Sequence, residues 1–175
     1  MKLLKTKKVL ALSAVLVAAS GGTAMAVLSG SAGGAQLLMQ NRGDNAPNLT
    51  SSTVFSDVPG GTVSVNVPAG ASQLVNARFT AESQCTRALP ALGGWCSVRI
   101  VAQRVGGATV ELNPVAGLDY AFDSVQGGDQ LEGHAMERSI RLPAGAYIIR
   151  AQRAVTDPAI TLRLDDWHLA VETSA

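Results

Sequence analysis

A strict alternation of apolar and polar residues, interrupted by Pro and Gly, governs this chain from about residue 53 onward. From Thr62 to Val67, valine occupies every second position and Thr, Ser or Asn occupies the others. Side chains of a β-strand point alternately to opposite faces, so this period of two predicts strands with one buried and one solvated face. Three interruptions predict turns between successive strands, namely Pro59-Gly60-Gly61, Pro68-Ala69-Gly70 and Pro143-Ala144-Gly145.

Strands of this kind recur to the end of the chain, with the longest expected over residues 131–142 and 146–155 and a short one around 120–122. No stretch carries a helical stripe of apolar residues. The predicted fold is therefore all-β, a single antiparallel β-sandwich of eight or nine strands over residues 53–175. The arrangement is expected to be jelly-roll-like rather than immunoglobulin-like.

The N-terminus has the form of a secretory signal peptide. Four lysines lie within the first eight residues, an apolar run follows from Val9 to Ala19, and Ala24-Met25-Ala26 fits a small-x-small cleavage site. We expect cleavage after Ala26. The alternative is an uncleaved signal anchor, since weakly apolar residues continue to Leu28. Either way the chain is predicted to be exported, and after cleavage no membrane attachment is expected.

Residues 27–52 are rich in Gly, Ala, Ser and Asn, and they predict a flexible low-complexity linker between the signal peptide and the sandwich. Two short patterns occur in this linker. Arg42-Gly43-Asp44 imitates an adhesion tripeptide, and Asn48-Leu49-Thr50 imitates a glycosylation sequon. Both are short enough to arise by chance, and we assign neither a function.

Charge excludes two classes of partner. Of the 14 basic residues of the full chain, four are the lysines of the signal segment, so ten arginines face 13 acidic residues in the mature protein. The resulting formal net charge is −3, with no basic run. Electrostatic binding to nucleic acid or to an anionic membrane is therefore not expected.

Cys85 and Cys96 are the only cysteines, and an exported chain lets them form a disulfide. They enclose ten residues, so the bridge would clamp a local connection between two strands and differ from the long-range bridge of immunoglobulin domains. A redox pair would more often be Cys-x-x-Cys, so we interpret the bridge as structural. Trp95 is expected to pack against it.

Several short motifs resemble an uncharacterised family of small exported β-sandwich proteins of actinobacteria. They are Phe79-x-Ala81-Glu82-Ser83-x-Cys85, Gly94-Trp95-Cys96-Ser97-Val98-Arg99-Ile100, Ala121-Phe122-Asp123-Ser124, His134-x-Met136-x-Arg138-Ser139, Pro143-x-Gly145-x-Tyr147 and Leu164-Asp165-Asp166-Trp167-x-Leu169. The resemblance implies a secreted sandwich and no assigned activity. More loosely, the Pro143 and Asp165 motifs are similar to strand ends of jelly-roll carbohydrate-binding modules.

His134 and Arg138 form the first candidate ligand-binding site. They share strand parity with Met136, Ile140 and Leu142, so they are expected to point toward the inner face of the sandwich or its rim. There they could form a polar pocket. The alternatives are a bulge that turns His134 outward, or an Arg138 neutralised by a buried carboxylate. We favour these structural roles.

Asp165, Asp166 and Trp167 form the second candidate site. Apolar parity switches here, from Ile160 and Leu164 before the aspartates to Trp167 after them, which predicts a bulge at the aspartates with Trp167 inside. In the functional alternative, Trp167 is an exposed platform for a sugar ring and the aspartates bind its hydroxyls. We favour the buried tryptophan.

A third cluster consists of the loop carboxylates Asp119, Asp123, Asp129 and Glu132, which could bind calcium. Their spacing matches no established calcium loop, and a solvated hairpin explains it as well. We therefore predict no metal and no cofactor.

Catalysis has little support in the sequence. His134 and His168 are the only histidines, and neither Gly-x-Ser-x-Gly nor His-Glu-x-x-His occurs. The chain is expected to be an exported binding or interaction module rather than an enzyme, with carbohydrate or another cell-envelope component as candidate ligand. The alternatives are a structural protein that forms a homo-oligomer and, with less support, a hydrolase.

Overall fold

The computed structural model describes residues 33–88, 93–125 and 130–175. In these residues the strands are β1 (Gln36–Asp44), β2 (Asn48–Thr50), β3 (Ser56–Arg87), β4 (Trp95–Arg104), β5 (Thr109–Glu111), β6 (Asp123–Ser124), β7 (Glu132–Val155) and β8 (Ile160–Ser174), and the only helical turn is the 3₁₀ turn η1 (Gly117–Asp119). The predicted all-β antiparallel fold is confirmed. The short strand expected at 120–122 lies instead at Asp123–Ser124.

The long antiparallel pair of β3 and β7 organises the fold. The pairing runs from Ser56 opposite Arg153 to Ser83 opposite Glu132. Its register shifts twice, once between Asp57 and Thr62 and once between Val67 and Ser72. Each shift adds residues to β3 only, so β3 bulges and bends while β7 continues beside it.

The Pro and Gly interruptions in β3 therefore bend one continuous strand, and the prediction that they reverse the chain is wrong. Gly60 and Gly70 lie at the two bends with φ of 74° and 76°, the left-handed region that glycine enters without steric cost. Pro143-Ala144-Gly145 does not reverse the chain either. It lies within β7 opposite the second bend, where Val67 pairs with Gly145 and Ser72 with Pro143.

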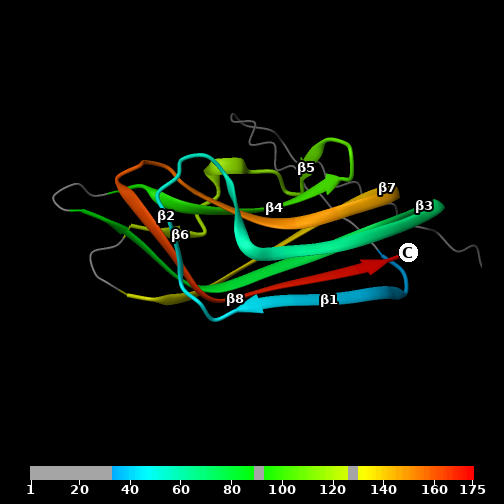
Figure 1. Ribbon diagram of the computed structural model, residues 1–175, viewed down its shortest axis with the longest axis horizontal. Coiled ribbons are helices and arrows are strands. Elements are labelled where there is room, and N and C mark those ends of the chain that lie inside the picture. The colour runs from blue at the N-terminus through cyan, green and yellow to red at the C-terminus, as the bar shows by residue number, and fades with distance from the viewer. Residues whose placement is uncertain (1–32, 89–92, 126–129) are drawn as a thin grey trace, which may run out of the picture.

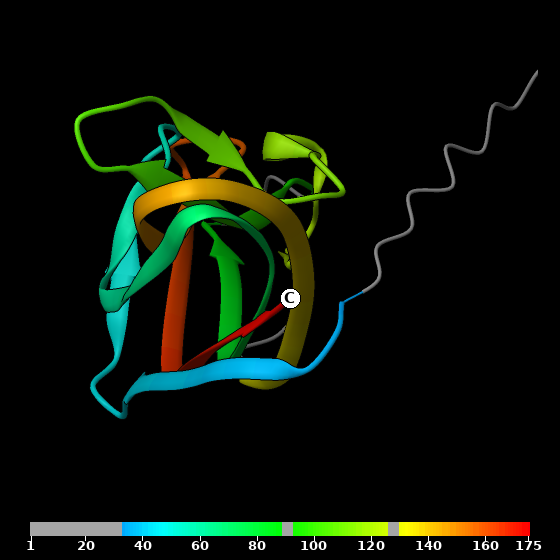
Figure 2. The same cartoon turned by 90° about the vertical axis from the view of Figure 1, so that its right-hand side faces the viewer.

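The bends divide the sheet into two layers packed face to face. In layer one, residues 72–87 of β3 lie between β8 and residues 132–143 of β7, and β1 and β2 extend the layer beyond β8. In layer two, residues 56–67 of β3 pair with residues 145–153 of β7, which pairs with β4, and β5 and β6 complete the layer. Figure 2 shows β3 and β7 curving from one layer into the other.

The space between the layers is filled by the alternating apolar side chains that the sequence predicts. Phe79 lies at its centre and contacts the ring of Trp167 at a centroid distance of 6.2 Å and that of Phe122 at 5.9 Å. A Cβ atom on Gly60 would lie 3.6 Å from the Trp167 ring. Glycine at this bend of layer two thus allows close approach to the tryptophan of layer one.

Residues 36–50 correct the predicted linker. β1 pairs with the C-terminal half of β8, with Met39 opposite Glu172, and β2 pairs with its N-terminal half, with Asn48 opposite Leu164. Both are edge strands. Most residues of β1 are exposed and those of β2 are exposed or half-buried, so their sequence carries no strong alternation. The linker prediction is wrong for these residues. The predicted signal peptide, residues 1–26, and residues 27–32 lie outside the described residues.

Arg42-Gly43-Asp44 belongs to β1 and Asn48-Leu49-Thr50 forms β2, so neither motif is displayed on a flexible segment. The Asp44 carboxylate accepts a hydrogen bond from the Ala46 backbone N–H at 3.0 Å and so holds the turn between the two strands. Across residues 33–88, 93–125 and 130–175, no helix is long and apolar enough to cross a membrane.

Cys85 and Cys96 form the predicted disulfide, with their Cα atoms 5.9 Å apart. Cys85 lies near the end of β3 in layer one, and Cys96 lies at the start of β4 in layer two. The bridge is therefore local in sequence and yet joins the two layers.

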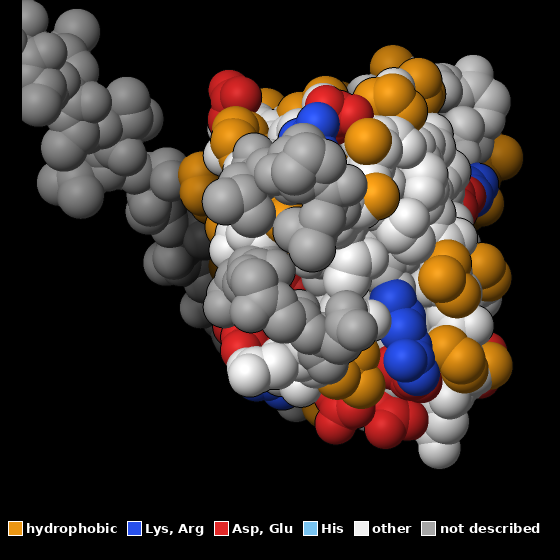
Figure 3. Space-filling model, turned by 90° about the vertical axis from the view of Figure 1, so that its left-hand side faces the viewer, with side chains coloured by type: hydrophobic (Ala, Val, Ile, Leu, Met, Phe, Trp, Pro, Cys, Tyr) orange, Lys and Arg blue, Asp and Glu red, His pale blue; other side chains and the backbone are white. Residues whose placement is uncertain are grey.

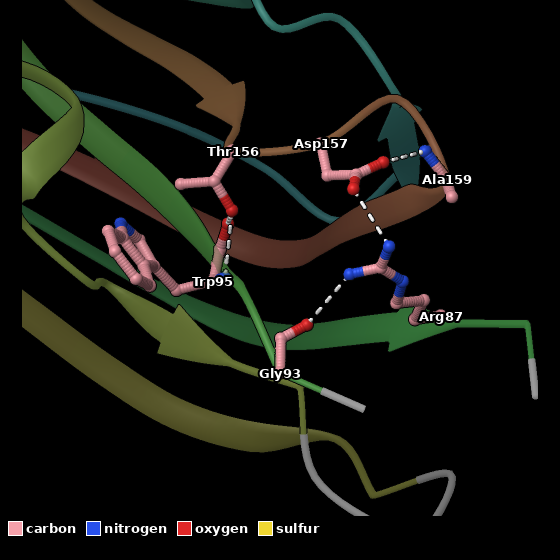
Figure 4. Close-up of polar contacts among 6 residues, drawn as sticks. All are labelled: Arg87, Gly93, Trp95, Thr156, Asp157 and Ala159. Atoms are coloured by element: carbon pink, nitrogen blue, oxygen red, sulfur yellow. Dashed lines mark hydrogen bonds and ion pairs between the residues drawn. The ribbon is translucent and has the colours of Figure 1, made fainter. Parts of the chain in front are cut away.

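Polar contacts reinforce the disulfide end of the sandwich (Figure 4). Arg87 Nη2 forms an ion pair with Asp157 Oδ2 at 2.8 Å, and Arg87 Nη1 donates to the Gly93 carbonyl at 3.2 Å. The Thr156 hydroxyl accepts from the Trp95 N–H at 3.1 Å and donates to the Trp95 carbonyl at 3.0 Å. The chain crosses between the layers twice at this end, and these contacts tie the two crossings together.

We expect the double substitution Cys85→Ala/Cys96→Ala to lower the free energy of unfolding by about 3 kcal/mol, because opening this short loop restores chain entropy to the unfolded state. Urea unfolding of the oxidised protein and the variant measures the difference. Wild type unfolded in the presence of a reductant serves as control and should match the variant. A loss below about 1 kcal/mol in both would contradict a structural role for the bridge.

Candidate functional site

His134 lies on the inner rim of layer one in a chain of polar contacts. Its Nδ1 is 2.9 Å from Ser83 Oγ, and Ser83 Oγ donates to Asp123 Oδ2 at 2.8 Å. On the other side, His134 Nε2 is 4.0 Å from a Glu132 carboxylate oxygen. The ring also contacts Phe122 at a centroid distance of 5.6 Å.

The direction of the protons in this chain follows from its members. A carboxylate only accepts, so Ser83 must donate its hydroxyl proton to Asp123, and His134 Nδ1–H then donates to the serine oxygen. Ser83 is only 1% exposed. The serine is thus buried and its proton is directed away from the histidine, which is opposite to the arrangement that activates a serine nucleophile.

Arg138 lies four residues after His134 on β7, with its guanidinium 4.5 Å from the centre of the Tyr120 ring. Its Nη1 donates to the backbone carbonyl of Glu137 at 2.9 Å. His134 and Arg138 thus share one face of β7, as predicted. Both contact the segment 113–125, which crosses from β5 toward layer one and bridges to β7 through Asn113 and Ser139. Their contacts hold that segment against β7.

The predicted bulge at the paired aspartates is present. The register between β3 and β8 shifts between Thr80 and Glu82, opposite His168 and Asp165. Asp166 lies in the shift with φ of 44° and is exposed. Asp165 is tied to Arg163, whose Nη2 lies 2.6 Å from its carboxylate, and its other oxygen accepts from the Asp166 N–H at 3.1 Å.

Trp167 points inward, as the parity switch predicts, and is 3% exposed. It therefore provides no platform for a sugar ring. Tyr147 is also buried and donates its hydroxyl to the Pro143 carbonyl at 3.0 Å. Trp95 is half-buried, and its indole N–H donates to the Leu118 carbonyl at 2.6 Å.

The loop carboxylates have separate environments. Asp123 accepts a hydrogen bond from Ser83, Glu132 faces His134, and Asp119 is exposed as the last residue of η1. Asp129 lies outside the described residues. In the part of the chain that the structure describes, no three His, Cys, Asp or Glu side chains gather in a group that could hold a metal ion.

A concave surface lies on the solvated face of layer one. Two adjoining hollows of about 410 Å³ and 200 Å³ share Asn76, Glu137 and Glu172, and we call them together the outer groove. The remaining lining residues are Gly33, Gly34, Gln36, Leu74, Ser139, Thr173 and Ser174 in the larger hollow and Arg78 and Ala170 in the smaller.

Strand register explains why these residues meet. Asn76 on β3 lies opposite Glu172 on β8 and opposite Ser139 on β7. Its amide Nδ2 donates to Glu137 Oε1 at 2.7 Å, which fixes the orientation of that carboxylate. The floor of the outer groove is thus polar, and it rests on paired strands rather than on loops.

The end of the molecule where β3 ends and β4 begins faces the viewer in Figure 3. On the described part of that face, hydrophobic side chains are interspersed with polar and charged ones and form no broad continuous patch (Figure 3). The sequence prediction missed the outer groove because its members lie far apart along the chain and occupy outward positions, where polar residues are ordinary.

Comparison with known proteins leaves the family open, because no family model and no curated protein matches this chain.

We expect Ser83→Ala to lower the free energy of unfolding by about 1.5 to 3 kcal/mol, since it leaves the buried Asp123 carboxylate and His134 Nδ1–H without their shared partner. Thermal or urea unfolding measures the loss. Ser64→Ala, on an exposed position of β3, is the matched control and should change stability by less than about 0.5 kcal/mol. Equal effects of the two substitutions would show that the polar chain is not stabilising.

Proposed function

We propose that this protein is an exported binding module whose ligand occupies the outer groove. The observation that carries the proposal is a hollow of about 410 Å³, adjoining a second one, on the outward face of layer one. This volume lies within the roughly 300 to 1,000 Å³ of small-molecule sites. The groove is also lined by oriented polar groups.

The chemistry of the groove favours a ligand rich in hydroxyl groups. The carboxylates of Glu137 and Glu172 accept hydrogen bonds, and the amides of Asn76 and Gln36 both donate and accept. Neighbouring hydroxyls of a carbohydrate present the complementary groups. Because no aromatic residue is among those that line the described groove, recognition would depend on hydrogen bonds rather than on ring stacking.

The supporting strands favour binding without rearrangement. Asn76, Glu137 and Glu172 project from three adjacent strands, and the hydrogen bond between Asn76 and Glu137 holds one acceptor in place. Polar groups that are fixed before the ligand arrives lose less entropy when it binds. A rigid sheet is therefore a suitable platform for a polar ligand that is bound through hydrogen bonds.

Two features support export. The disulfide between Cys85 and Cys96 is a bond that persists in oxidising compartments. The basic and apolar N-terminal segment with its small-residue cleavage site has the form of a secretory signal. A cell-envelope or extracellular polysaccharide would be within reach of such a protein.

The proposal includes no catalytic residue. Ser83 is the serine beside a histidine, but it is buried and its proton is bonded to Asp123. A hydrolase that uses it would have to open the sandwich and reverse that hydrogen bond.

One observation favours an oligomer as the second candidate. β1 is the outermost strand of layer one, and its Leu37 and Met39 are 53% and 50% exposed. An unprotected edge strand with apolar side chains can pair with the same strand of another copy.

The binding proposal predicts that the double substitution Glu137→Gln/Glu172→Gln weakens binding to a polysaccharide that the wild-type domain binds. The loss should be about tenfold or more, because two charged acceptors become neutral amides. Glycan-array screening and cell-wall polysaccharide pull-down with the purified domain identify the probe, and calorimetry then gives the affinities. Glu82→Gln, at an exposed glutamate of β3 that does not line the outer groove, is the control and should bind as wild type. If no polysaccharide is retained, or if all three proteins bind equally, the outer groove is not the site.

The oligomer candidate predicts a dimer or larger species in light scattering of the wild-type protein. Met39→Lys should convert it to a monomer, since a charged side chain on an edge strand opposes pairing between sheets. Asn41→Lys, on a neighbouring exposed position of the same strand, tests whether any added charge suffices. A wild-type monomer at all concentrations removes this candidate.

A further inference from the structure

Arg153 breaks the pattern of the strand on which it lies. The inward-facing positions of this part of β7 are Ile149, Ala151, Arg153 and Val155, and the three apolar ones are fully buried. Arg153 is itself only 7% exposed and lies opposite Val98 of β4 and Ser56 of β3. A guanidinium therefore occupies a position where the strand pattern calls for an apolar residue.

The buried guanidinium has almost no partners. Among the described residues, its single hydrogen bond runs from Nη2 to the Leu49 carbonyl at the long distance of 3.4 Å. The Nε and Nη1 atoms are buried without any hydrogen bond. An arginine side chain has five N–H donors, so four of them lack a protein acceptor.

Other arginines of the described chain differ in this respect. Arg87, Arg150 and Arg163 each form an ion pair with an aspartate. Arg153 has no carboxylate within ion-pair distance among the described residues. Burial without a compensating charge also lowers the pKa of its guanidinium.

Such a group is costly unless something neutralises it. Removing a charge from water is strongly unfavourable, and an opposite charge with hydrogen bonds offsets that cost. Water could satisfy the donors but would supply no charge. The missing partner is therefore expected to be an anion with several acceptor oxygens.

A short and largely exposed crossing of the chain lies against Arg153. Residues 48–55 cross from β2 in layer one to β3 in layer two, and the Leu49 carbonyl that contacts Arg153 belongs to this crossing. Residues 51–54 are exposed. The crossing is held by a bond from Val155 N–H to the Ser52 carbonyl at 2.9 Å and by contact of the Ser51 and Thr161 hydroxyls at 3.0 Å.

The side chain of Asn48 adds a second unpaired polar group at the start of this crossing. Its amide oxygen is buried and has no hydrogen-bond donor. A displacement of residues 48–55 would uncover the guanidinium, and it would also break the pairing of β2 with β8 and the contact of the Phe55 ring with Arg99.

We propose that Arg153 is the binding group of an oxyanion site beneath residues 48–55, which takes a phosphate, sulfate or carboxylate group. The site lies between the layers at the edge of the sandwich and is distinct from the outer groove, which lies on the outside of layer one. It does not depend on the function proposed for that groove.

Thermal unfolding of the full mature chain in phosphate, sulfate or acetate, against chloride at constant ionic strength, tests this site. Bound anion stabilises only the folded protein, so the midpoint should rise saturably, by about 5 to 10 °C when phosphate reaches roughly one hundred times its Kd. Arg153→Met should abolish the rise. In chloride it should unfold at or above the wild-type midpoint, because it removes an uncompensated buried charge.

Arg104→Met, which removes an exposed arginine on β4, is the matched control and should keep the full response. An equal rise in wild type and Arg153→Met, or no rise in wild type with any of the three oxyanions, overturns the proposal. If Arg153→Met does not fold, NMR of wild-type arginine Nε–H groups decides. One protected Nε–H signal should then shift saturably with phosphate, and the absence of such a shift also overturns the site.

Discussion

The antiparallel pairing of β3 with β7 is the interaction on which the rest of the structure depends. One continuous pair of strands supplies two neighbouring strands to each layer, so the two halves of the sandwich cannot form independently. At the bends beside Gly60 and Gly70, the pair passes from one layer into the other. Both glycines have a left-handed φ, which glycine adopts without steric cost. β8 and β1 then add to one side of the pair, and β4 and β5 to the other.

Much of this architecture is readable from the sequence, because strand parity is a local property. The parity switch beside Asp165 correctly predicts both the bulge and the burial of Trp167, and the short spacing of Cys85 and Cys96 correctly predicts a local bridge. Proline and glycine proved less informative. They mark where the chain leaves the extended conformation, but whether it then reverses or resumes beside the same partner depends on a strand about 80 residues away.

Edge strands and sites were harder to predict. β1 gains its structure from pairing with β8, and an edge strand exposed on most positions needs no alternating pattern. In the sequence, the polar residues of the outer groove do not differ from other solvent-facing strand positions. Only the strand register brings Asn76 next to Glu172 and Glu137. Arg153, by contrast, carried a local signal, since it follows Ile149 and Ala151 at the same parity. A charged residue at the parity of apolar ones is the same kind of signal that singles out His134 and Arg138 in the sequence.

The adjacency of the two ends of the described chain bears on how the domain would respond to force. The Gly34 N–H donates to the Ala175 carbonyl at 2.7 Å, and β1 runs antiparallel to β8 from that point. Tension applied between these ends would load the hydrogen bonds of the β1–β8 pair one after another, as in unzipping, rather than all together in shear. The strand would therefore peel away at low force, beginning beside the outer groove that Gly33 and Gly34 help to line. A load on the chain and a ligand in that groove would then compete for the same few residues.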